Sequence, residues 1–401
     1  MPISVTLRPR SISKVYNNRQ HLELNSSERN KHMIPKKLIT IAILAVLLIA
    51  ACNKKQTTTT SNKVRIGYIG LTCEASIFMA VEKGFFKEEG LDVEMVKCDW
   101  KNYKDTLALG GYDMTQHLVM YFLKPIEQGL DVKFTGGIHR GCLRVQAAAK
   151  SDIHSIQDLR GKRIGVPGMG TPPFIFANRV LATNGIDPSK EISWRVFPAG
   201  ELGLALDKGE VDAVANAEPI GTLLLANEKV RNVADQATDT PYNEEYCCEV
   251  IVNGKFLAAN PKSTAAATRA LLKGAKWVEA NPAAAAQLSV EKKYLASNPQ
   301  INTVAISHLR YIPSVSRAEA SVLTAAEGMK AAGMLLPSTD VSDLAKRAFV
   351  HLDGVSDDWV RDVQIEKVAS GQLPPDQDIR KFAKTILSEK KDSCCLLSAK
   401  E

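Results

Sequence analysis

Two adjacent cysteines are the pattern in this sequence with the most chemical potential. Cys247 and Cys248 lie in the stretch EEYCCEV, residues 244–250. Neighbouring cysteines can hardly form a disulfide with each other, because the short connection strains the dihedral angle that the bond prefers. In an extended strand their side chains point to opposite faces. What these thiols do therefore depends on what the fold brings near them.

Familiar catalytic motifs are absent from the chain. The sequence contains no G-x-S-x-G, H-E-x-x-H, Walker or C-x-x-C motif. We therefore expect no enzyme activity and no resident cofactor.

The N-terminal region has the pattern of an export signal. Lys36 and Lys37 precede an apolar run over residues 38–49, which is too short to cross a bilayer comfortably. The small residues that follow, in Ile49-Ala50-Ala51-Cys52, resemble a bacterial lipobox, in which the cysteine is lipidated and becomes the mature N-terminus. We therefore expect an exported lipoprotein, anchored by a lipid on Cys52 to the extracytoplasmic face of the cell membrane.

The flanking segments fit an anchored protein. Residues 1–51 form the expected signal region, and Met33 stands where such a signal should start, although a long n-region that includes residues 1–32 is the alternative. Residues 52–62 are polar and low in complexity, as in a flexible tether. Residues 387–401 read as a polar tail.

The charge of the chain does not indicate a nucleic acid partner. The formal net charge is +7, but residues 1–51 hold eight Lys/Arg and two Asp/Glu, which leaves only about +1 for the rest. The sequence shows no basic stripe with interleaved aromatic residues. Nucleic acid is therefore set aside.

Alternating strand and helix patterns indicate an α/β protein with two halves. Residues 63–70 read as a strand and 74–90 as a helix, and the alternation restarts at about residue 155. Each half carries a helix that ends at G-x-x-D, at Gly110–Asp113 and at Gly209–Asp212, before a strand. This pattern favours two tandem lobes with parallel-rich sheets.

Four segments in this order resemble the solute-binding proteins of nitrate, taurine and sulfonate ABC transporters, and the binders of thiamin-pyrimidine precursors. They are AVEKGFFKEEGLDVEMV, LGGYDMT, DLRGKRIGVPGMGT and LDKGEVDAVANAEP. The resemblance covers roughly residues 63–350. It implies an α/β, type II periplasmic binding protein-like fold with two lobes, two crossing strands and a ligand cleft. It also implies capture of a small molecule by a monomer that delivers it to an ABC permease and ATPase.

The resemblance also assigns the lobes. Lobe I comprises 63–145 and 250–386, and lobe II comprises 146–249. The outward crossing is expected at 137–149 and the return at 244–254.

Several residues are expected at the ligand cleft. The glycine loop before the helix at Thr171 offers free N–H groups that suit an anion. His117 follows a strand expected at 112–115, at the end where α/β sheets bind ligands. Glu218 matches the family's acidic residue before proline. The full set of expected ligand contacts is Thr72, Cys73, Glu74, His117, Cys142, Gly170, Thr171, Asn216, Glu218 and Cys248.

The family fold would bring Cys73, Cys142 and the Cys247–Cys248 pair towards one place. One interpretation is structural: the thiols pack, or a disulfide from Cys142 braces the hinge of an exported protein. The other is that they bind the ligand, either a soft metal, a metal-containing species or a thiol-reactive solute. Only one of the adjacent pair is expected to face the cleft.

Two other functions stay open. A thiamin-pyrimidine synthase shares the fold and uses a cysteine-rich motif with iron, but this chain has only Cys247-Cys248 where a longer run is wanted. A surface lipoprotein that senses a ligand is the third class, since fold alone does not fix function.

Overall fold

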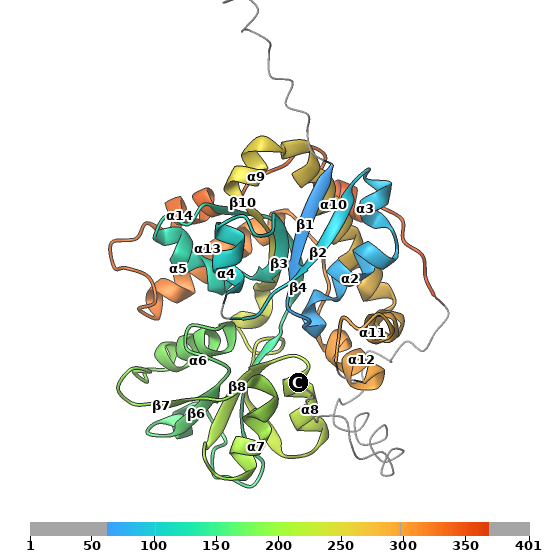
Figure 1. Ribbon diagram of the computed structural model, residues 1–401. Coiled ribbons are helices and arrows are strands. Elements are labelled where there is room, and N and C mark those ends of the chain that lie inside the picture. The colour runs from blue at the N-terminus through green and yellow to red at the C-terminus, as the bar shows by residue number, and fades with distance from the viewer. Residues whose placement is uncertain (1–61, 101, 297, 369–401) are drawn as a thin grey trace, which may run out of the picture. The chain divides into compact units, whose positions relative to one another are not determined.

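The computed structural model describes residues 62–100, 102–296 and 298–368 (Figure 1). The signal region 1–51, Cys52, the rest of the tether up to residue 61 and the polar tail lie outside the described residues. Residues 369–386 of the expected first lobe lie outside them as well.

Two five-stranded sheets organise the described chain. The strands of the first sheet run in the order β2 (Asp92–Lys97), β1 (Lys63–Tyr68), β3 (Met114–Leu118), β10 (Tyr246–Asn253) and β4 (Val132–Arg140). The strands of the second run in the order β7 (Ser193–Val196), β6 (Arg163–Val166), β8 (Ala213–Ala217), β5 (Leu143–Ala148) and β9 (Val230–Asp235).

Each sheet is mixed, with four strands that run in one direction and one strand that runs against them. In the first, β1 pairs in parallel with β2 and β3, whereas β10 runs antiparallel to β3 and β4. In the second, β6 pairs in parallel with β7 and β8, whereas β5 runs antiparallel to β8 and β9. The two lobes thus share one topology, and the antiparallel strand of each is the one that follows a crossing between sheets.

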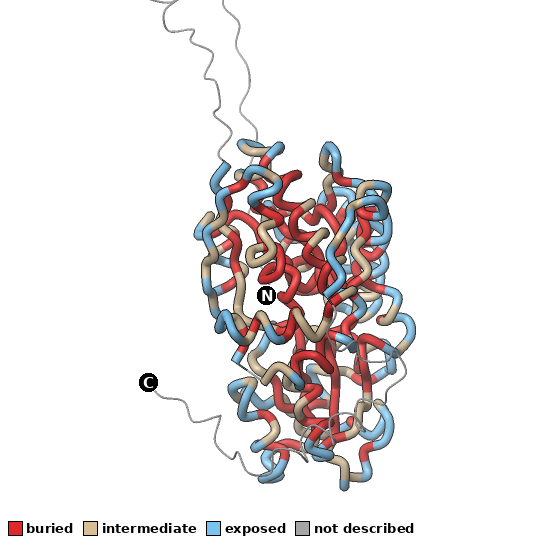
Figure 2. Tube along the Cα trace, turned by 90° about the vertical axis from the view of Figure 1, so that its right-hand side faces the viewer, coloured by how far each residue is buried: buried red, intermediate tan, exposed pale blue. Residues whose placement is uncertain are grey.

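Helices cover both sheets. The first lobe has η1 (Thr72–Glu74), α2 (Ala75–Glu82), α3 (Phe85–Glu88), α4 (Tyr103–Ala108), α5 (Val119–Glu127), α9 (Gly254–Ala259), α10 (Pro261–Ala280), α11 (Pro282–Glu291), α12 (Pro299–His308), α13 (Ser316–Ala331), α14 (Val341–Ala348) and α15 (Asp357–Asp362). The second has η2 (Gln157–Leu159), α6 (Pro172–Thr183), η3 (Ala199–Glu201), α7 (Leu202–Asp207), α8 (Ile220–Ala226) and η4 (Tyr242–Glu244). Figure 1 shows α2 and α10 on one side of the first sheet, and α4, α5 and α13 on the other. Figure 2 shows the buried residues gathered in the interior of the trace and the exposed residues along its outer edges.

The repeated G-x-x-D motif has the same physical role in both lobes. Asp113 accepts hydrogen bonds from the backbone N–H of Arg65 at 2.9 Å and from its guanidinium at 2.6 and 3.1 Å. Asp212 accepts the equivalent bonds from Arg163, at 2.8 Å from the backbone and 2.7 and 3.1 Å from the guanidinium. Each aspartate therefore ties the strand it precedes to that strand's parallel neighbour, β1 in the first lobe and β6 in the second.

The chain crosses between the sheets twice. The outward crossing is Gly141 and Cys142, between β4 and β5, so the expected boundary at residue 145 falls inside β5. The return crossing runs from 236 to 245, and Tyr246 already belongs to the first sheet. The adjacent cysteines thus lie on a strand of the first lobe.

One strand differs from its expected bounds. His117 lies inside β3, not after it, because β10 pairs with every residue from Met114 to Leu118 and extends the strand beyond residue 115. Among the described residues, no helix is both long enough and apolar enough to cross a membrane.

Candidate functional site

Four thiols meet beneath the surface where the crossings join the first sheet. Cys73 comes from η1, Cys142 from the outward crossing, and Cys247 and Cys248 from the start of β10. None of the four side chains is more than 3% exposed. Cys142 interacts by hydrogen bonding with Cys73 and Cys247, and Cys248 interacts with Cys73 and Cys247. The expected convergence of these cysteines is confirmed.

The expectation that Cys247 and Cys248 point in opposite directions is wrong. Tyr246 pairs with Arg140 and Cys248 pairs with His139, so Cys247 is an extra residue with no partner on β4. A bulge of this kind interrupts the regular alternation of side chains and re-aims the residues beside it. Both thiols consequently reach the cluster.

The five cysteines in the described residues are free thiols, so of the alternatives left open by the sequence the hinge-bracing disulfide is not formed. Hydrogen bonds from Cys247 and Cys73 hold the pKa of Cys142 below its usual range. The hydrogen bond to Cys142 raises the pKa of Cys73, and burial raises the pKa of Cys247 and Cys248. Hydrogen bonding within the cluster therefore favours the thiolate form at Cys142 more than at the other three cysteines.

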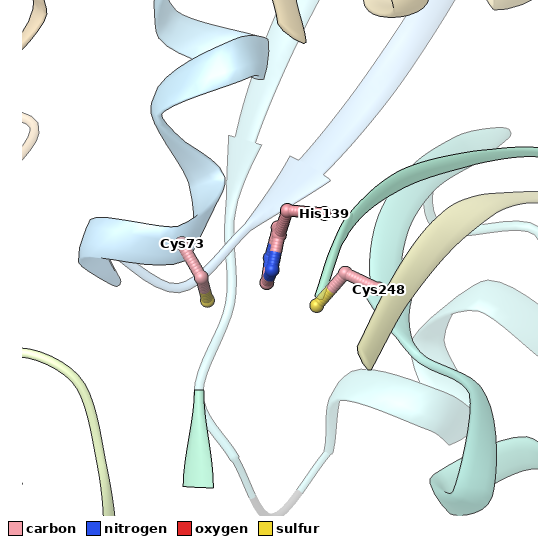
Figure 3. Close-up of side chains that lie close together, drawn as sticks. All are labelled: Cys73, His139 and Cys248. Carbon is pink, nitrogen blue, oxygen red and sulfur yellow. The ribbon is translucent and has the colours of Figure 1, made fainter. Parts of the chain in front are cut away.

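His139 completes this group, although it was not among the expected contacts. One of its ring nitrogens and the sulfurs of Cys73 and Cys248 all lie within 4.8 Å of one another. Figure 3 shows the three side chains gathered at one place. Little in the sequence indicated this contact. His139 lies three residues before Cys142, but only the pairing of β10 with β4 places it opposite Cys248.

The loop after β1 is held by Thr72 and Glu74. The Glu74 carboxylate accepts backbone N–H groups from Ile69, Gly70 and Leu71 at 2.7–3.1 Å, and burial raises its pKa to about 7. Thr72 donates its hydroxyl to Asn302 at 2.9 Å. Both residues thus fix the position of Cys73, and their direct contact with a ligand stays a prediction.

A buried ionic network lies in the second lobe. Arg144 pairs with Glu218 and, at 2.9 Å, with Asp235, and its side chain is 1% exposed. His308 on α12 lies 3.1 Å from Asp235, which links the first lobe to this network. The network explains why Glu218 is buried rather than solvated.

Asn216 lies beside this network with one polar atom unpaired. Its side-chain amide donates to Gln146 at 2.8 Å, whereas its Oδ1 is buried and has no hydrogen-bond partner in the described residues. A buried acceptor without a hydrogen bond lowers the stability of the folded state by about 1–3 kcal/mol, and a ligand that donates a hydrogen bond to it would remove this cost. Contact of this atom with a ligand stays a prediction.

The glycine loop precedes α6 as expected, but the Thr171 N–H is not free, since it donates to the Gly168 carbonyl at 3.3 Å. Gly170 has φ +75° and is exposed, and α6 begins at Pro172 with Thr171 as the preceding cap residue. The Thr171 hydroxyl donates to the Gly168 carbonyl at 2.7 Å. Contact of this loop with an anion stays a prediction.

His117 occupies an aromatic pocket away from any hydrogen-bond partner. Its ring lies 4.5 Å from that of Tyr103 and 5.2 Å from that of Tyr121. Both ring nitrogens are buried without partners in the described residues, and burial lowers the pKa of His117 to about 3. The imidazole is therefore neutral.

Comparison with known proteins places this geometry in context. A family model described as NMT1/THI5 like matches residues 72–285, slightly more than half of the chain. The formylaminopyrimidine-binding protein of Halalkalibacterium halodurans is 27% identical over 67% of this chain and 82% of its own length. The 4-amino-5-hydroxymethyl-2-methylpyrimidine phosphate synthase of Aspergillus parasiticus is 26% identical over 56% of this chain and 68% of its own length.

A solved structure agrees on the fold. The alkanesulfonate-binding protein SsuA from Xanthomonas axonopodis pv. citri superposes with a TM-score of 0.60 at 17% identity, over 73% of this chain and 99% of that one. The expected two-lobed periplasmic binding protein fold is thereby confirmed.

Proposed function

The chain belongs to the NMT1/THI5-like family, and from this premise we propose that it is the extracytoplasmic solute-binding component of an ABC importer. It captures one small molecule between its two lobes and delivers it to a membrane permease and its ATPase. The observation that carries the proposal is the pair of sheets with one topology, joined by two short crossings. Small-molecule sites occur preferentially between such lobes.

Unpaired polar atoms support particular ligand contacts. The Oδ1 of Asn216 and both nitrogens of His117 are buried and have no partner among the described residues. The exposed turn at Gly170 and the adjoining Thr171 precede the N-terminus of α6, where an anion would be favoured. We assign these four residues to ligand contact, while Glu74 and Glu218 hold the surrounding backbone and Arg144 in place.

Export and anchoring belong to the same proposal. A solute-binding protein must stay near its permease, and a lipid on Cys52 followed by a polar tether achieves this. The body is proposed to act as a monomer.

A thermal-shift experiment tests the proposal. The purified chain is heated with formylaminopyrimidine and alkanesulfonates, which are named as the solutes of similar proteins, and with other small anions and soft metal ions. A ligand at 100 times its Kd stabilises a protein by about 2.7 kcal/mol, which raises the Tm measurably. A rise with one solute class supports the function, and no rise across the panel contradicts it.

An enzymatic function is the second candidate, because one relative is named a pyrimidine phosphate synthase. Its cysteine motif would correspond to Cys247 and Cys248. The chain is incubated with iron and with each solute of the thermal-shift panel, and the mixture is analysed by mass spectrometry. This experiment distinguishes an enzyme from a binding protein. Release of a new product supports the enzyme, whereas the unchanged solute recovered from the protein supports binding.

A further inference from the structure

The cluster of four thiols provides more potential metal-binding sulfur atoms than packing alone requires. Its members come from three segments that are remote in the sequence, namely η1, the outward crossing and β10. The bulge at Cys247 gives up one regular pairing position and brings a second thiol to the cluster. Bulges are over-represented beside active and binding sites, where they re-aim a side chain.

The Nε2 atom of His139 has a free lone pair that could bind a metal ion. Its Nδ1 lies 3.1 Å from the Gly141 carbonyl and 3.4 Å from the Arg140 carbonyl. A carbonyl oxygen only accepts, so Nδ1 must carry the proton and Nε2 must carry the lone pair. This Nε2 is buried and has no partner in the described part of the chain. Metal-binding histidines characteristically donate the other ring N–H to such a carbonyl.

Among the described residues, no carboxylate joins this group of donor atoms. The group whose donor atoms lie within 4.8 Å of one another consists of Cys73, Cys248 and His139, with no carboxylate. Glu74, the acid next to Cys73, has both oxygens engaged by backbone N–H groups. Thiolate and imidazole donors select Cu⁺ and Zn²⁺ over Mg²⁺ and Ca²⁺.

The spacing and the charge fit such a cation. Zinc with thiolate and imidazole ligands at their usual bond lengths places neighbouring ligand atoms roughly 3.3–3.8 Å apart, which is inside the observed limit. Two thiolates and a neutral imidazole around Zn²⁺ carry no net charge, and around Cu⁺ they carry one negative charge. Arg144, which interacts electrostatically with Cys142, offsets a negative charge there.

We infer that Cys73, Cys248 and Nε2 of His139 form a binding site for one thiophilic d¹⁰ cation, Cu⁺ or Zn²⁺, with Cys142 and Cys247 as adjoining sulfur donors. Each thiol that becomes a ligand releases one proton to solvent, and the imidazole contributes its lone pair without a proton change. This inference deepens the proposed function, on which it rests, because it names the class of solute that the importer would deliver.

Metal titration of the full chain tests the inference. The protein is reduced, freed of metal and kept anaerobic, and Zn²⁺ and Cu⁺ are added in separate experiments against a coloured chelator of known affinity. One equivalent of either ion should bind, and Mg²⁺ should not compete. Co²⁺ serves as a spectroscopic probe, since thiolate ligands give it intense charge-transfer bands in the near ultraviolet.

Single substitutions identify the ligands. Cys73→Ser, Cys248→Ser and His139→Gln should each weaken binding by about 100-fold or more, because losing even an outer partner of a metal ligand costs 10–100-fold. Cys98→Ser is the matched control, since that thiol is only half-buried and donates to the Val96 carbonyl at 3.6 Å. Circular dichroism checks that each variant is folded. If a variant fails to fold, the Co²⁺ spectrum of the unaltered chain still tests whether thiolates bind the metal.

The outcomes separate the inference from the proposed function. Stoichiometric binding that is lost in the three variants and kept in Cys98→Ser supports the site. Absence of binding, or equal binding in all variants, overturns it. A Tm rise with a small anion and no metal binding overturns the inference alone. Metal binding without any effect of deleting the chain on metal uptake by cells supports the site but contradicts the metal as the delivered solute.

Discussion

Glu249 on β10 lies directly opposite His117 on β3, and neither side chain has a hydrogen-bond partner among the described residues. Directly opposite residues of an antiparallel pair share one face of the sheet, so these two lie side by side. Burial lowers the pKa of His117 to about 3 and raises the pKa of Glu249 well above its usual range. His117 is consequently neutral at pH 5–7, and burial favours the neutral form of Glu249.

His117 should make the protein sensitive to acid. The unfolded chain has a histidine pKa near 6.5 and the folded chain one of about 3, so the unfolded state binds more protons between these values. The free energy of unfolding should therefore fall by about 3 kcal/mol between pH 6.5 and pH 4 from this residue alone. Chemical denaturation at several pH values measures this slope.

His117→Phe should reduce that slope, because the ring keeps its aromatic contacts but no longer titrates. The other groups around the site, Trp100, Tyr103, Tyr121 and Glu249, are unchanged in the variant. His351→Gln is the control, since that side chain is 65% exposed. Equal acid slopes in wild type and His117→Phe would contradict the prediction.

The Arg144 network should be costly to break. Asp235 accepts hydrogen bonds from Arg144 and Asn232 and also lies beside His308. Burial opposes its ionisation, but the contacts with His308 and Arg144 outweigh burial and hold the pKa of Asp235 below its usual range. Asp235→Asn should destabilise the protein by about 3–5 kcal/mol, because Arg144 keeps a buried charge with one counterion fewer.

An exposed ion pair provides the comparison for this loss. Asp343 and Arg347 lie one turn apart on α14, at 2.7 Å, with about half of each side chain exposed. Asp343→Asn should change stability by less than about 1 kcal/mol. Urea denaturation measures the free energy of unfolding of both variants. Equal decreases in Asp235→Asn and Asp343→Asn would contradict the prediction that burial makes the Arg144 network more costly to break.

The sequence predicted those parts of the fold that depend on local patterns. The G-x-x-D repeats marked the two lobes, because in each lobe the motif follows a helix. Its aspartate bonds an arginine 48 or 49 residues earlier in the chain, Arg65 or Arg163. The start of α6 followed from Pro172 and Pro173, which suit the first turn of a helix. Such features need little knowledge of distant pairing.

The site depended on pairing that no local pattern shows. Strand alternation predicts opposite directions for Cys247 and Cys248, and only the register of β10 against β4 creates the bulge that overrides it. The same register places His139 beside Cys248. His117 was expected beyond the end of its strand for a similar reason, since β10 supplies the partner that extends β3.

The lipid anchor is testable without reference to the fold, since Cys52 lies outside the described residues. Cells that express the chain are grown with radiolabelled fatty acid. The wild-type protein should be labelled and found in the membrane fraction, whereas Cys52→Ser should be unlabelled and released. Initiation at Met33 should leave both results unchanged, and label in the Cys52→Ser protein would refute lipidation at this residue.

Gly141 should be the position in the outward crossing that tolerates substitution least. Its φ of +67° lies in the left-handed region, and a Cβ added there would lie 2.4 Å from the Cβ of Ala237 on the return crossing. Gly161 has a similar φ of +74° but open space around it, so it isolates the backbone cost. Gly161→Ala should cost about 1 kcal/mol for the left-handed conformation. Gly141→Ala should cost that amount plus about 1–3 kcal/mol for overpacking, because the two crossings must move apart. Thermal unfolding of the two variants measures the difference, and equal Tm values would show that the crossings are not tightly packed at this point.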